Sequence, residues 1–198
     1  MSAPELAARA DAAGGVALAD CSADIVEIAA LRTGARALRE AVRARLGEAL
    51  PAHGRVSRHA DRLILSVRPE RWLLLAPPAA PGVFAKLCEN ACAGSGAAVE
   101  LSSALTALYL AGPAVRETLA RSCRLDLDPQ HFGAGRAAAT FMAQVPVTLA
   151  VLPAGVLLLT PSTTGRHFRE WLAGAAAPFG LTRRTDATVA HFIGEGMT

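Results

Sequence analysis

The chain has 198 residues, of which 52% are hydrophobic and 19% are charged, a composition typical of one globular domain or of two small halves that share a core. It excludes a disordered chain, which would carry more charge and less apolar mass, and no apolar run reaches the length of about 18 residues that a membrane-spanning helix needs. The formal net charge is +3, but the ten arginines and four acidic residues between Arg32 and Arg71 give that stretch a local net charge of +6.

The N-terminus begins "MSAPELAARADAAGG" and has no basic segment before an apolar stretch, so it is not a secretory signal. We expect residues 1–20 to form a flexible tail. The chain has four cysteines, Cys21, Cys88, Cys92 and Cys123, and no two of them form a C-x-x-C motif. This pattern favours buried thiols in a reducing cytoplasm over disulfides or a zinc site.

The first half of the chain predicts four strands and two helices. In order they are a strand at 25–31, a helix around 37–42, a strand at 62–67, an apolar strand ending at Pro77, a helix, and a strand at 97–102. The second helix places Phe84, Leu87, Cys88 and Ala91 at the spacing of one helix face, which we expect to cover the sheet.

The second half repeats this pattern. "LLLAPPAAPGVFAKLCENA" at 73–91 matches "LLLTPSTTGRHFREWLAGA" at 157–175, and "ALREAV" at 37–42 matches "AVRETL" at 114–119. The equivalent face of the last helix carries Phe168, Trp171, Leu172 and Ala175, with Trp171 expected to be buried. Strands are expected at 106–112, 144–151 and 181–189.

Each half therefore reads β-α-β-β-α-β, the ferredoxin-like unit of an antiparallel sheet with helices on one face. The sequence predicts an α+β fold of two pseudo-symmetric halves, residues 21–96 and 97–198, packed as one domain.

The segment "SCRLDLDP" at 122–129 concentrates groups that could do chemistry. Leucines alternate with Asp126 and Asp128, so a short half-buried strand or a turn accounts for the pattern. An acid–base pair would need a neighbouring base, a metal or a deep pocket, and the sequence supplies none. Arg124 and Cys123 lie at the end of the preceding helix, where the helix dipole raises a thiol pKa, so a core cysteine is expected.

Other motifs also favour structural roles. "HFGAGRA" at 131–137 lacks the third glycine of a dinucleotide loop and predicts a turn. Ser102 and Ser103 lack a nucleophile elbow, and the dispersed histidines form no metal-ligand cluster. We therefore expect no catalytic, cofactor-binding or metal-binding residue in this chain.

Arg32, Arg36, Arg39 and Arg43 would form one ridge along a helix. A solvated helix face is the simplest interpretation, and docking on an acidic partner surface is the alternative. Nucleic-acid binding would require interleaved aromatic residues or a known motif, so neither a nucleic-acid nor a membrane partner is expected.

Several ordered motifs resemble the gamma subunit family of heterotetrameric sarcosine oxidases. They are "LS…TAL" at 101–108, "L-x-GP" at 110–113, "C-x-LDL-x-P" at 123–129, "F-x-x-G" at 132–135, "QVPVTL" at 144–149 and "WL" at 171–172. The resemblance covers residues 97–180 best. The same segment is more distantly similar to the folate-binding domain of glycine-cleavage aminomethyltransferases, which implies a folate-binding-domain-like fold.

The resemblance implies a non-catalytic structural subunit in a cytoplasmic flavoprotein complex that oxidatively demethylates sarcosine (N-methylglycine) to glycine. Tetrahydrofolate would accept the one-carbon unit and oxygen the electrons. The partners would be the alpha, beta and delta subunits. The flavins FAD and FMN would lie in beta, NAD and tetrahydrofolate in alpha, and zinc in delta, with no cofactor in this chain. The alternatives are a small free-standing folate-binding or one-carbon-transfer protein, and the equivalent subunit of a related N-methyl amino acid dehydrogenase.

Overall fold

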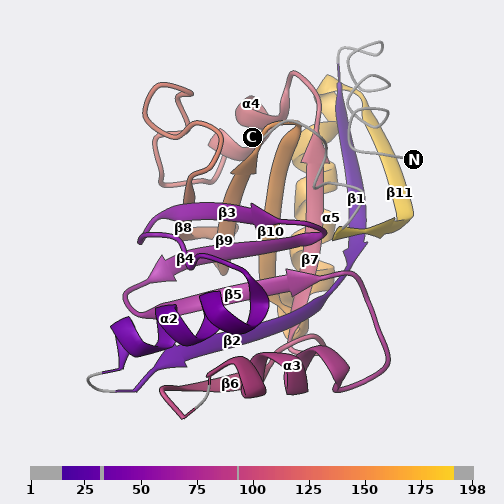
Figure 1. The fold of residues 1–198 in the computed structure, drawn as a ribbon. Helices are drawn as coiled ribbons and strands as arrows, with labels where there is room; N and C mark the ends of the chain where they lie inside the picture. The colour runs from indigo at the N-terminus through magenta and orange to yellow at the C-terminus, as the bar shows by residue number, and fades with distance from the viewer. Residues whose placement is uncertain (1–14, 32–33, 93, 190–198) are drawn as a thin grey trace.

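The computed structural model describes residues 15–31, 34–92 and 94–189. Within these residues two β-sheets pack face to face, and helices cover the outer face of each sheet (Figure 1). The strands of one sheet cross those of the other steeply in this view. The layers are thus helices, sheet, sheet and helices, and the predicted α+β class is confirmed.

The first sheet is built from residues 24–100. Its elements are β2 (Asp24–Ala30), α2 (Ala35–Leu46), β3 (Arg55–His59), β4 (Arg62–Arg68), β5 (Arg71–Ala76), α3 (Val83–Cys92) and β6 (Gly96–Glu100). The strands lie in the order β3-β4-β5-β2-β6, and every neighbouring pair is antiparallel. Apart from the edge strand β3, this is the predicted ferredoxin-like unit.

The second sheet repeats that unit and adds one strand from the start of the chain. Its elements are β1 (Val16–Ser22), β7 (Leu105–Ala111), α4 (Val115–Ala120), β8 (Ala137–Met142), β9 (Val145–Leu152), β10 (Gly155–Pro161), α5 (Ser162–Ala176), the short 3-10 helix η1 (Ala177–Phe179) and β11 (Leu181–Thr188). The order is β11-β1-β7-β10-β9-β8. Without β1 it matches the first sheet, with β8 at the edge position that β3 holds there, so the predicted pseudo-symmetry is confirmed. β1 is inserted parallel to β11 and antiparallel to β7.

Each central strand is buried on both faces. On β5, Leu73 and Leu75 point into the core between the sheets, whereas Trp72 and Leu74 point toward α2 and α3. The "LLL" of β10 alternates in the same way between the inter-sheet core and the core under α5. Burial on both faces explains why these strands read as continuous apolar runs instead of alternating patterns.

The prediction of a flexible tail over residues 1–20 is wrong for residues 16–20. Residues 1–14 lie outside the described part of the chain, but Val16–Asp20 belong to β1, and Leu18 is only 3% exposed. β1 has no counterpart in the other half, and its two neighbours lie far away in sequence, so neither the repeat nor local periodicity could indicate it.

The expected boundary between residues 96 and 97 is also wrong. β6 runs from Gly96 to Glu100 and pairs with β2, so the first sheet extends to Glu100. Cys21 and Ser22, assigned to the first half, belong to β1 of the second sheet. Residues 190–198, assigned to the second half, lie outside the described residues.

The two predicted helix faces are confirmed except at one position in each. Phe84, Cys88, Ala91, Phe168, Leu172 and Ala175 are all buried. Leu87 is 38% exposed, because it lies at the rim of the contact between α3 and the sheet. Trp171 is only partly buried and stacks on Phe168, with ring centroids 6.1 Å apart and an interplanar angle of 7°. Among the residues that the structure describes, no helix is long and apolar enough to cross a bilayer.

Candidate functional site

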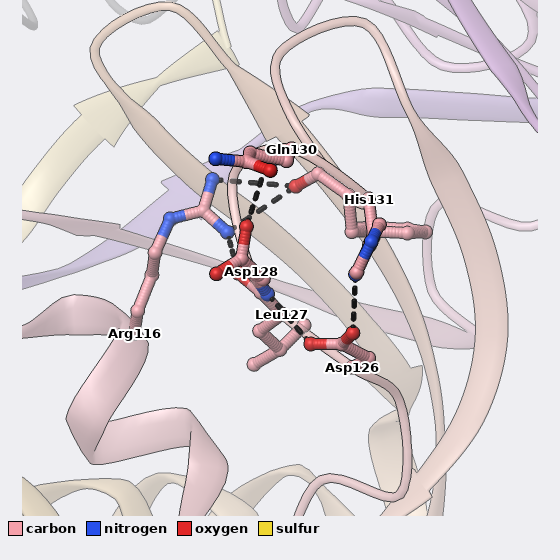
Figure 2. Close-up of polar contacts among 7 residues, drawn as sticks. Arg116, Asp126, Leu127, Asp128, Gln130 and His131 are labelled. Atoms are coloured by element: carbon pink, nitrogen blue, oxygen red, sulfur yellow. Dashed lines mark hydrogen bonds and ion pairs between the residues drawn. The ribbon is translucent and has the colours of Figure 1, made fainter.

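The loop after α4 carries the aspartates of "SCRLDLDP", and it forms turns instead of a strand. The backbone N–H of Asp128 donates to Asp126 Oδ1 at 2.9 Å, and that of Gln130 donates to Asp128 Oδ1 at 2.8 Å (Figure 2). In such turns the aspartate side chain takes the place of a backbone acceptor. Both carboxylates therefore shape the loop.

Arg116 holds this loop against α4 (Figure 2). Its guanidinium donates to the carbonyl oxygen of Leu127 and, at 3.2 and 3.3 Å, to that of Phe132. Leu127 is buried in the core between the second sheet and its helices. One arginine thus satisfies two loop carbonyls, and one leucine anchors the loop in the core.

Asp126 and His131 form an ion pair on the outer side of the loop. His131 Nδ1 lies 2.6 Å from Asp126 Oδ2, with the side chains 70% and 63% exposed. Hydrogen bonds from the Asp128 backbone N–H and from His131 lower the pKa of Asp126, and the bond to Asp126 raises the pKa of His131. A general acid or base acts on a substrate held in a site, whereas this pair faces solvent. That the chain has no catalytic residue stays a prediction.

The thiols are poor nucleophiles. Burial raises the pKa of both Cys21 and Cys88 to about 12, so these thiols stay protonated at neutral pH. Cys123 is half-buried, and its pKa is raised mainly by burial, which adds to the expected effect of the helix end. No group of three or more histidines, cysteines or acids within the described ranges is placed to hold a metal ion.

The remaining motifs are structural in the fold. Ser102 Oγ accepts a hydrogen bond from the Ile25 backbone N–H at 3.0 Å, tying the segment after β6 to β2. Residues 131–135 form the predicted turn, in which Gly135 has φ of +81° and donates its N–H to Val151 O at 2.9 Å.

The arginine ridge is only partly solvated. Arg32 lies outside the described residues, and Arg36 pairs with Glu40 at 2.9 Å on the exposed face of α2. Arg39 instead reaches the Leu50 carbonyl at 2.7 Å. Glu48, which sequence reasoning missed, is 1% exposed and accepts a hydrogen bond from Arg62 at 2.9 Å. A single acidic residue after a helix usually lies in solvent, and nothing in the neighbouring sequence indicates that this one is buried.

Two surface pockets are large enough for a small ligand. One of about 340 Å³ lies between Gly112-Pro113 and the β9–β10 turn, and its charged residue, Arg116, is already engaged by the loop. The other, of about 370 Å³, lies where β1 leaves β7 and continues into β2. Asp20 and Arg169 line it, and Arg169 Nε donates to Asp20 Oδ1 at 2.6 Å.

The paired ferredoxin-like halves define a folate-binding-domain type of α+β fold. The structure is similar to a glycine cleavage system aminomethyltransferase T from Bartonella henselae, with 15% identity and a TM-score of 0.63 over 92% of this chain and 50% of that one. At this identity the similarity concerns the fold alone.

The chain belongs to the sarcosine oxidase, gamma subunit family, whose model matches residues 32–177. It is 36% identical over 111 residues to a sarcosine oxidase subunit gamma from Arthrobacter sp, covering 55% of this chain and 54% of that one. It is 31% identical over 117 residues to the subunit gamma from Corynebacterium sp. (strain P-1), covering 59% and 57%. The chain thus spans about half the length of the curated relatives it matches.

A solved structure matches over nearly the whole chain. It is a heterotetrameric sarcosine oxidase from Corynebacterium sp. U-96 in complex with pyrrole 2-carboxylate, with 29% identity and a TM-score of 0.72. The match covers 90% of this chain and 95% of that chain. The family resemblance seen in the sequence is therefore confirmed in sequence and in fold.

Proposed function

We propose that this chain is the structural gamma subunit of a cytoplasmic heterotetrameric sarcosine oxidase and carries no active site of its own. The complex would demethylate sarcosine to glycine, with tetrahydrofolate accepting the one-carbon unit and oxygen the electrons. The observation that carries this proposal is the agreement between the family match over residues 32–177 and the similarity of 90% of the chain to a chain of a heterotetrameric sarcosine oxidase.

The chemistry would lie in the partner subunits. We assign FAD and FMN to beta, NAD and tetrahydrofolate to alpha, and zinc to delta, and no cofactor to this chain. The geometry of the candidate residues supports a structural role, since Asp126 and Asp128 bind backbone N–H groups of their own loop and Cys21 and Cys88 are buried thiols with raised pKa.

Purification of the native complex tests the proposal. The tagged chain should co-purify with three further subunits, and the complex should show flavin absorbance and form hydrogen peroxide when sarcosine is added. The chain expressed alone should be colourless and should not bind tetrahydrofolate. Recovery of a stable free chain that binds tetrahydrofolate would instead support a free-standing folate-binding protein. A complex that passes electrons to a dye but not to oxygen would indicate the related dehydrogenase.

A further inference from the structure

The pocket at the crossing from β1 to β2 places opposite charges side by side. Asp20 comes from β1 and Arg169 from α5, and their side chains are 31% and 38% exposed. The guanidinium uses Nε to bind Asp20 Oδ1. Within the described residues, no other hydrogen bond engages either group, so the terminal nitrogens of Arg169 and Asp20 Oδ2 are available to a ligand.

A close helix–strand contact brings the two charges together. Gly165 of α5 lies against Thr106 of β7, where an added Cβ would be 2.3 Å from Thr106 Oγ1. Arg169 follows Gly165 by four residues and therefore lies on the same face of the helix, one turn further along. The small residue lets α5 approach β7 closely enough for Arg169 to reach β1.

The other walls of the pocket suit a small molecule with one apolar part. Ile25, Leu105 and Ala107 supply apolar surface, and the Ser102 and Thr106 hydroxyls also line the space. Its volume of about 370 Å³ lies within the range of small-molecule sites. A guanidinium binds a carboxylate through parallel N–H groups, and a carboxylate binds an ammonium group by charge-assisted hydrogen bonds.

We propose that this pocket binds a small zwitterion, an amino acid whose carboxylate is held by Arg169 and whose ammonium group is held by Asp20. This assignment goes beyond the proposed function, which gives the chain no ligand, and it does not depend on turnover by any partner subunit. A partly exposed ion pair contributes little to folding, so the two residues can be replaced without unfolding the chain.

Calorimetric titration of the full chain with glycine, alanine and sarcosine tests the proposal. At least one of these zwitterions should bind saturably with one site per chain. Acetate and methylammonium each carry only one of the two charges, so they should bind at least about tenfold more weakly. No saturation by any of the three amino acids, or acetate binding as tightly as the amino acid, would overturn the assignment.

Variants locate the site. Arg169→Gln and Asp20→Asn should each weaken amino-acid binding by about tenfold or more. Arg166→Gln is the matched control, because Arg166 pairs with Glu170 on the exposed side of the same helix and should leave binding unchanged. Ala23→Leu narrows the pocket and keeps the ion pair, so it should weaken binding while both charges stay in place. Equal binding in Ala23→Leu and the unmodified chain would contradict the proposal.

Discussion

Arg39 of α2 lies over the indole of Trp72 on β5, with its guanidinium carbon 4.7 Å from the ring centroid. Arg39 also donates to the Leu50 carbonyl at 2.7 Å, and Trp72 Nε1 donates to the Pro51 carbonyl at 2.9 Å. The helix, the strand and the loop after the helix are therefore joined at one point. The α2 arginines differ in role, although their spacing alone makes them look equivalent.

Arg39→Met should lower the free energy of unfolding by about 1–2 kcal/mol, because it removes the cation–π contact and a hydrogen bond to a carbonyl. Arg36→Met is the control on the same helix, since Arg36 is 92% exposed and pairs with Glu40; it should change stability by less than about 0.5 kcal/mol. Urea unfolding monitored by circular dichroism measures both. Equal losses of stability in the two variants would show that the contact between Arg39 and Trp72 does not stabilise the chain.

Two glycines of α5 should respond in opposite directions to alanine. Gly174→Ala should stabilise the chain by about 0.5–1 kcal/mol through helix propensity, because an added Cβ meets nothing within 4 Å. Gly165→Ala should destabilise it, because the Cβ would overlap Thr106 Oγ1 at 2.3 Å. Thermal unfolding of both variants checks this. A Gly165→Ala variant as stable as Gly174→Ala would contradict the tight helix–strand contact.

Trp171 and Phe168 should differ in their cost of truncation. Phe168 is fully buried, so Phe168→Ala should cost about 3–5 kcal/mol. Trp171 is half-buried and stacked on it, so Trp171→Ala should cost about 1–2 kcal/mol.

Iodide quenching separates the two tryptophans of the chain. With Trp72→Phe, the remaining Trp171 should be quenched measurably, whereas with Trp171→Phe the buried Trp72 should be protected. If both tryptophans were equally protected from iodide, Trp171 would be fully buried, as the helix pattern predicted.

The His131–Asp126 pair predicts a pH window. Because the pKa of His131 is raised, its contribution to stability is present below the ordinary histidine value of 6.5 and is lost as pH rises through the folded value. Because the pKa of Asp126 is lowered, its contribution is present above the ordinary value of 3.8 and is lost as pH falls through the folded value. The pair is thus complete between these two ordinary values. In Asp126→Asn, NMR titration should place the His131 pKa lower than in the unmodified chain, and an unchanged value would disprove the coupling.

Asp126→Asn and Asp128→Asn, made separately in the assembled complex, should leave sarcosine turnover within a few-fold of the unmodified complex. Both carboxylates accept hydrogen bonds from their own loop, whereas loss of a true acid or base costs on the order of 10²–10⁴ in rate. A loss of that size in a complex that still assembles would make the loop catalytic.

The repeated segments made most of the fold predictable. The match of 73–91 with 157–175 identified β5 with β10 and α3 with α5, the central strand and a covering helix of each sheet. Edge strand β3 was not placed, because a short strand with mixed polarity resembles a loop in sequence. β1 was missed because its neighbours are set by tertiary pairing and by no local pattern.

The candidate pocket could not be predicted from sequence. Asp20 and Arg169 are 149 residues apart and come from a strand and a helix without a shared motif. By contrast, the loop around Asp126 was correctly expected to contain a turn, because aspartate and proline act on their immediate neighbours.

The insertion of β1 has a consequence for how the chain folds during synthesis. Val16 pairs with Leu181 and Ala17 with Ala111, so neither neighbour of β1 exists when the ribosome has made only the first sheet. β1 must therefore wait for β11 before its sheet is complete. Such distant pairing is slow and leaves apolar strand surface open to aggregation in the nascent chain. Synthesis of β11 is therefore the earliest stage at which the second sheet can close, and binding to a chaperone before that stage would protect β1 and β7.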